Sequence, residues 1–275
     1  MSGNPLQQYF RQSKIYIDLP SKGVYNKPGT ITGDASNMPV YGMTGMDEII
    51  MKTPDALISG ESAVKVIQSC CPHIVDAWDV STLDTNLIFA AIKIATFGNS
   101  LTVGHRCPEC GAENDYAFDL DFVIDHYGKC KYDNKLNLGD ITIITQPLTY
   151  KQSTEYNMAT FVIQQKLGQA NSLEKEEERV KFYQEIFEEL AALQNDVYFK
   201  NIERIEIPGQ VVEEREYILE WLKNCDKSVF DKVRDHMENN KKAWELPAHP
   251  VKCTECNAES NIIIELDQTN FFVNA

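Results

Sequence analysis

Two cysteine pairs of identical spacing are the residues in this sequence best suited to chemistry. The stretch CPECGAENDYAFDLD begins at Cys107, and CTECNAESNIIIELD begins at Cys253. The two stretches agree at seven of fifteen positions, including both cysteines, the Glu between them and the closing Leu-Asp. Each Cys-x-x-Cys turn presents two thiolates, and two such turns supply the four ligands of a structural zinc site. The sequence therefore predicts one Zn²⁺ per chain, bound by Cys107, Cys110, Cys253 and Cys256.

Other uses of the two pairs remain open at this point: redox chemistry, or cysteines that stay unbound or bind separately. A thioredoxin-like motif needs a pair at a turn between a strand and a helix, whereas extended segments flank both pairs here. Gly111 and Asn257 follow the two turns, and both residue types readily adopt the positive φ that such a turn needs. Because four thiolates leave no open coordination position, we expect a structural site and not a catalytic one.

Several residues near the pairs are secondary candidates. His105 and His249 precede the two pairs and offer a substitute ligand or a hydrogen bond to a thiolate, although an ordinary strand or loop position is the simpler interpretation. Glu109 and Glu255 lie inside the turns, where we expect them to be exposed. Cys130 is a weak fifth candidate ligand.

The remaining residues give no sign of catalysis. Adjacent Cys70 and Cys71 are expected to be buried thiols at a helix end, since free cysteine is among the most buried residue types, and Cys225 receives no role. The sequence has no Gly-rich phosphate loop, no GxSxG and no HExxH motif. It therefore predicts no catalytic residue, no organic cofactor and no enzyme activity.

Composition narrows the class of partner. The chain has 275 residues, 43% of them hydrophobic, and a formal net charge of −15. Nucleic-acid affinity depends on Lys and Arg neutralising phosphates, so this acidity argues against a nucleic-acid partner and favours a basic protein surface.

We also expect no membrane span, because no apolar run approaches about 18 residues. The polar N-terminal stretch lacks a signal-peptide core, which favours assembly in a cytoplasm.

The order of the predicted elements indicates an α+β fold in three parts. Residues 1–100 form a mixed α/β region of short strands, turns and helices. Residues 101–147 and 246–275 carry the cysteine pairs between strands and form a discontinuous, zinc-ribbon-like β module. Residues 148–245 are mostly amphipathic helix and form a domain inserted into that module. Such an insertion need not disturb the metal site if its two ends lie close together.

Helix boundaries in the first region carry local signals. Thr44 or Gly45 is suited to cap the helix that contains DEII, whose acidic residues favour a helix N-terminus. Ser81 or Thr82 is a good N-cap for the most strongly apolar helix of this region, and Gly98 is a good stop for it.

The N-terminal region also carries a resemblance. The stretches IYIDLPSKGVYNKPGTITG and MPVYGMTGMDEIIMKTPDALISGESAVKVIQSCCP resemble the baseplate hub proteins of T4-type contractile-tailed bacteriophages. The most specific parts of the resemblance are the LPSKG turn and the MTGMDEI…KTPDAL…G segment. The resemblance is concentrated in residues 15–104. It becomes looser through the cysteine and strand regions and carries no family feature onto the helical insertion.

The resemblance implies a virion protein of the tail baseplate, assembled in the host cytoplasm without enzyme activity. Its partners would be other hub and tail proteins, among them the tape-measure protein, and further copies of this chain in a symmetric baseplate. Two other functions stay open: an assembly chaperone that leaves before the virion is complete, and a zinc ribbon that binds nucleic acid. The net charge argues against the last of these.

Overall fold

The chain forms two compact units in a computed structural model that describes residues 4–53, 59–170 and 175–264. Unit 1 contains the chain up to Cys130 and again from Trp244 onwards, and unit 2 contains Lys131–Ala243. Helices and small antiparallel sheets make up both units, which confirms the predicted α+β class. Within these described residues no helix combines the length and apolarity needed to cross a membrane.

One almost wholly buried helix organises the N-terminal part of unit 1. This helix, α4, runs from Thr82 to Phe97, and its buried side chains include Leu87, Ile88 and Ile92. An apolar surface on nearly every side requires cover, and β1 (Ser13–Ile17), β2 (Met38–Tyr41), α3 (Glu61–Cys70) and α5 (Asp121–Lys129) pack against it. The other elements of this part are η1 (Pro5–Tyr9), α1 (Gly45–Met51) and η2 (Ala77–Asp79).

The predicted helix signals are confirmed. The Thr44 side chain accepts a hydrogen bond from the backbone N–H of Asp47, and Asp47 returns the contact in a capping box that begins α1. The side chain of Ser81 caps α4, and Gly98 ends it with φ 91°. Cys70 and Cys71, at the end of α3, are fully buried, as expected.

A buried polar network holds the LPSKG turn to α4. Asp84, within α4, accepts hydrogen bonds from the backbone N–H of Ser21 at 2.9 Å and from its hydroxyl at 2.5 Å. The Asn26 side-chain amide adds a third bond to the same carboxylate at 3.1 Å. Lys22 and Gly23 both have positive φ, which places the turn in a conformation that glycine adopts at low cost. The LPSKG turn is therefore fixed by hydrogen bonds to the central helix.

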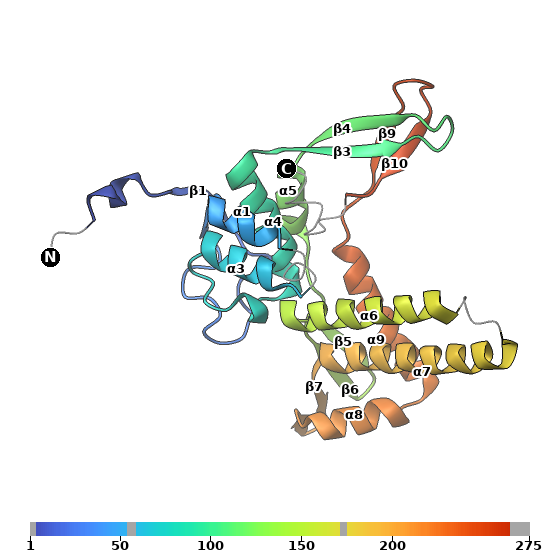
Figure 1. Ribbon diagram of the computed structural model, residues 1–275. Coiled ribbons are helices and arrows are strands. Elements are labelled where there is room, and N and C mark those ends of the chain that lie inside the picture. The colour runs from blue at the N-terminus through green and yellow to red at the C-terminus, as the bar shows by residue number, and fades with distance from the viewer. Residues whose placement is uncertain (1–3, 54–58, 171–174, 265–275) are drawn as a thin grey trace. The chain divides into compact units, whose positions relative to one another are not determined.

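The two cysteine pairs lie at the tips of two antiparallel hairpins in unit 1 (Figure 1). The hairpins pack through an apolar cluster of Val251, Ile262 and Ile264 with side chains of the first hairpin and of α5. The strands predicted on both sides of each cysteine pair are confirmed. The first hairpin joins β3 (Ser100–Arg106) to β4 (Glu113–Asp119), and the second joins β9 (His249–Lys252) to β10 (Glu259–Ile262).

Unit 2 combines a four-stranded antiparallel sheet with helices. The sheet has the strand order β5-β6-β7-β8, so each strand pairs with its neighbour in sequence. The strands are β5 (Lys135–Leu138), β6 (Ile141–Thr145), β7 (Ile202–Ile207) and β8 (Gln210–Val212). The helices are α6 (Tyr150–Ala170), α7 (Glu176–Asn201), α8 (Arg215–Asn224) and α9 (Lys227–Ala243).

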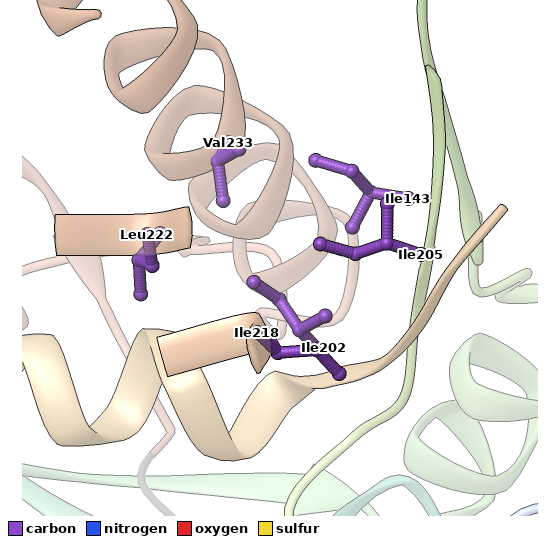
Figure 2. Close-up of a cluster of buried hydrophobic side chains, with 6 residues drawn as sticks. All are labelled: Ile143, Ile202, Ile205, Ile218, Leu222 and Val233. Atoms are coloured by element: carbon purple, nitrogen blue, oxygen red, sulfur yellow. The ribbon is translucent and has the colours of Figure 1, made fainter. Parts of the chain in front are cut away.

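The main core of unit 2 lies between the sheet and the last two helices. Figure 2 shows its six buried aliphatic side chains, contributed by β6, β7, α8 and α9. Elements from both ends of the unit come together to form it, so the sheet packs with α8 and α9 around one core. The six residues are Ile143, Ile202, Ile205, Ile218, Leu222 and Val233.

The position of β5 and β6 differs from the sequence-based division. The sequence pattern predicts that residues 101–147 belong to the β module, but β6 pairs with β7, which lies beyond the α6–α7 hairpin. The compact unit consequently begins at Lys131 and contains a sheet as well as helices. A strand pattern shows that a segment is extended without showing which strand it pairs with, and only tertiary contacts settle this. That the three predicted parts are independent domains stays a prediction.

Asp84 gives the N-terminal part of unit 1 a specific pH dependence. Burial raises the pKa of Asp84, against the hydrogen bonds from Ser21 and Asn26, which lower it. The native state therefore holds this proton more tightly than the unfolded chain does, and the contribution of Asp84 to stability falls as the pH rises from about 4. The variant Asp84→Asn cannot titrate. We expect its unfolding free energy, relative to that of the parent chain, to improve as the pH rises, and urea unfolding at a series of pH values measures this difference. A difference that stays constant with pH would contradict the interpretation.

Candidate metal centre

The four predicted cysteines converge at one point. Their Sγ atoms all lie within 4.8 Å of one another. Sγ of Cys107 lies 3.7 Å from that of Cys256, and Sγ of Cys110 lies 3.7 Å from that of Cys253. These separations far exceed the S–S bond of about 2.05 Å in a disulfide. Four sulfurs at about 2.3 Å around a tetrahedral zinc ion lie about 3.8 Å apart. The spacing therefore fits four ligands of one tetrahedral ion.

The two turns have the same backbone construction. In the first, the N–H of Cys107 donates to Ala112 O at 2.8 Å, and the N–H of Gly111 donates to Cys107 O at 3.0 Å. In the second, the N–H of Cys253 donates to Ala258 O at 2.9 Å, and that of Asn257 donates to Cys253 O at 3.0 Å. Gly111 and Asn257 have φ of 74° and 59°, as the sequence predicts. The repeated sequence therefore encodes a repeated turn.

Local hydrogen bonds favour the thiolate form of Cys253. Backbone N–H groups of Cys256 and Glu255 point at the Cys253 sulfur and lower the pKa of this thiol to about 6. The thiolate is the form that binds metal, so these N–H groups favour the ligand form of Cys253, whereas the neighbouring sulfurs raise the pKa of Cys110 and Cys256.

Asn114 of the first hairpin fastens the second turn. Its Oδ1 accepts the backbone N–H of Thr254 at 2.9 Å and the Thr254 hydroxyl at 2.6 Å. Its Nδ2 lies 3.5 Å from the Cys253 sulfur and 3.1 Å from Ala112 O. Because Asn114 is buried, these bonds are shielded from competing water. One amide thus ties the two hairpins together at the sulfur cluster.

Among the described residues, no equivalent side chain of the second hairpin binds the turn of Cys107 and Cys110, and the sequence shows why. Ser260 occupies in the second repeat the place of Asn114 in the first, and Pro108 occupies the place of Thr254. Proline has neither a backbone N–H nor a hydroxyl to donate. The Ser260 hydroxyl is bonded instead to Nε2 of His105 at 3.0 Å. The two turns therefore have the same backbone conformation but differ in the side-chain hydrogen bonds that they receive from the opposite hairpin.

The secondary candidates lie outside the sulfur cluster. His105 contacts Ser260, and the ring of His249 lies against the rings of Phe118 and Phe122, with centroids 5.3 and 4.4 Å away. Both histidines thus occupy strand positions that join the hairpins. Glu109 and Glu255 are exposed, as expected.

The other cysteines are also separate from the cluster. The sulfur of Cys130 lies 3.5 Å from Nε2 of His126, and that of Cys225 contacts Leu222 O at 3.4 Å. Burial raises the pKa of Cys70 to about 12 and also raises that of Cys71, which keeps both thiols protonated and unreactive.

The arrangement can hold an ion but offers it no free position for a substrate. Within the described ranges, the four cysteines are the one group of three or more His, Cys, Asp or Glu side chains placed to share a metal. Cys107 and Cys253 are buried, while Cys110 and Cys256 are exposed, so the cluster lies at the surface with one shielded side. A site with four protein thiolates stabilises a fold and does not activate water.

Asn114 is the residue near this site that the sequence analysis missed. The alignment of the repeats contained a weak signal, since Asn114 and Thr254 are both polar where their counterparts are Ser260 and Pro108. Only the packing of one hairpin on the other shows that this pair is in contact.

Comparison with known proteins gives one match. A sequence model described as "T4 bacteriophage base plate protein" matches residues 46–273. The matched range includes the cysteine pairs and also the helical block, onto which the sequence analysis carried no family feature, and it begins after the LPSKG turn. No curated protein and no solved structure gave a match.

The support of the second turn by Asn114 is directly testable. The variant Asn114→Ala removes the acceptor of both Thr254 donors, so we expect the metal-saturated chain to lose about 1–3 kcal/mol of unfolding free energy. The matched control is Ser260→Ala, which removes the single contact with His105 and should cost less, about 0.5–1.5 kcal/mol. Urea unfolding measures both values. A smaller loss for Asn114→Ala than for Ser260→Ala would contradict the asymmetry.

Proposed function

Because the chain belongs to the T4 bacteriophage base plate protein family, we propose that it is a structural component of the baseplate hub of a contractile phage tail. It acts through contacts with other hub and tail proteins and not through catalysis. The family match over residues 46–273 carries this proposal, since the range covers most of both units.

The construction of the metal site supports a structural role. We propose that Cys107, Cys110, Cys253 and Cys256 bind one Zn²⁺ per chain, for which the sulfur separations of 3.7 Å are suitable. Zinc binding to such a site contributes directly to folding free energy, because the ligands are brought together only in the folded chain. The ion would hold the two hairpins in fixed relation and supply no reactive group.

Surface charge supports a protein partner. The net charge of −15 is unfavourable for binding to a polyanion, whereas it favours association with a basic protein surface. The proposed location is the tail baseplate of the virion, after assembly in the host cytoplasm.

An assembly chaperone, for example for the tape-measure protein, is the second candidate. One observation favours it: Met158, Phe161 and Val162 form an exposed apolar stripe on α6. Apolar stripes on exposed helices are a common means of holding another helix. A chaperone of this kind would leave before the virion is complete.

Mass spectrometry of purified virions separates the two candidates. We expect peptides of this chain at a constant ratio to other baseplate proteins in mature particles. Their presence in assembly intermediates combined with their absence from mature particles would contradict the structural role and support the chaperone.

Metal analysis tests the site independently of location. We expect about one zinc per purified chain and a clear fall in melting temperature on treatment with a chelator. Cys110→Ser should lose the metal and part of the stability. Cys225→Ser, which changes a cysteine outside the cluster, should keep both. Metal-free protein of unchanged stability, or equal zinc in the two variants, would exclude the shared site.

A further inference from the structure

The segment Asn4–Gln12, called the arm below, is ordered by its own sequence and has little cover from its own unit. The side chain of Asn4 accepts the backbone N–H of Leu6 at 3.0 Å, and Pro5 opens the short helix η1. None of the residues of η1 is buried. Figure 1 shows η1, in dark blue, extended away from the helices of its unit.

The arm presents large apolar side chains to solvent. Leu6 is 60% exposed, Tyr9 76% and Phe10 57%. Three such side chains within five residues form a contiguous apolar surface rather than scattered exposure. Apolar surface of this kind marks a site of interaction, because each side chain gains free energy when it leaves water.

Arg11 fixes the base of the arm. Its guanidinium donates to Gly42 O at 2.5 Å and to the carbonyl and hydroxyl oxygens of Ser69 at 2.7 and 2.8 Å. It also lies 3.4 Å from Oδ2 of the buried Asp47, within α1. A fixed base limits the directions that the arm can take, which reduces the entropy lost when its apolar side chains bind a partner.

The neighbouring surface indicates which partner this is. The guanidinium of Arg11 is bonded within its own unit, and the rest of the arm carries no charged side chain. The arm therefore suits an apolar surface. Helix α1 offers one beside the base of the arm, since Met46 and Ile49 are 65% and 62% exposed.

We propose that two copies of this chain form a two-fold dimer by exchanging arms, with Leu6, Tyr9 and Phe10 of one copy packing on α1 of the other. Each copy carries both the arm and the receiving surface. In a two-fold dimer the contact between arm and α1 therefore forms twice, once in each direction. One arm buries on the order of 300 Å² of side-chain surface. The two arms and the two receiving surfaces together bury on the order of 1,200 Å² of surface, the lower limit for a stable interface. A single arm on an unrelated partner would fall below that limit.

Sedimentation of the full chain over a range of concentrations tests the proposal. We expect a reversible dimer, and the triple variant Leu6→Ser, Tyr9→Ser, Phe10→Ser should weaken dimerisation at least about tenfold. The control changes three similarly exposed side chains in unit 2, Val180, Phe187 and Tyr217, to Ser and should leave the dimer intact. Circular dichroism and metal content should stay the same in both variants. A parent chain that is monomeric at every concentration, or a triple variant that dimerises as well as the parent, would overturn the proposal.

A photo-crosslinking residue at position 9 locates the contact. In a mixture of isotopically labelled and unlabelled chains, we expect a crosslink between the two kinds of chain, on the peptide that contains Met46 and Ile49. A crosslink confined to one chain, or to a surface remote from α1, would refute the exchange. The outcome does not depend on the hub proposal or on zinc, because virion content and metal content are measured separately.

Discussion

The convergence of four sulfur atoms is the constraint on which the organisation of this chain depends. Cys110 and Cys253 lie 143 positions apart in sequence, and their sulfurs lie 3.7 Å apart. The chain leaves unit 1 after Cys130, forms unit 2 and returns to unit 1 at Trp244. The entropy of closing a loop grows only with the logarithm of its length, so a long insertion adds little to the cost of bringing the second pair back. A cluster formed by four thiolates can thus unite a small β module whose halves are far apart in sequence.

The two halves of that module differ where they contact each other. Their backbones make the same turn with the same hydrogen bonds, and seven of fifteen aligned residues are identical. Their side chains have different tasks: Asn114 binds the opposite turn, while Ser260 binds His105. Proline at position 108 explains the difference, since it removes the N–H donor that the symmetric contact would need. The two turns that bring the four cysteines together therefore share a backbone conformation, while only one of them is held by an asparagine of the opposite hairpin.

Buried polar groups have a structural role elsewhere in unit 1 as well. Asp84 holds the LPSKG turn to α4, and Asp47 combines the capping box of α1 with the contact to Arg11. Each carboxylate is bonded by several donors, which offsets part of the cost of its removal from water. Such groups specify how segments join, while apolar side chains of the arm and of α1 stay exposed. This distribution suits a protein whose work is assembly.

The sequence by itself determined the features that depend on residues close to one another. The CxxC spacing with Gly111 or Asn257 after it specifies the turn and its ligands, and Thr44, Ser81 and Gly98 specify where α1 and α4 begin or end. These signals are readable because the atoms that form each bond lie within a few residues. Only the tertiary structure decided that β6 pairs with β7, that Lys131 opens the second unit, that Asn114 meets Thr254 and that Arg11 reaches Ser69. A hydrophobic pattern fixes which face of a strand is buried, but a partner distant in sequence is chosen by packing and hydrogen bonds that exist only after the chain has folded.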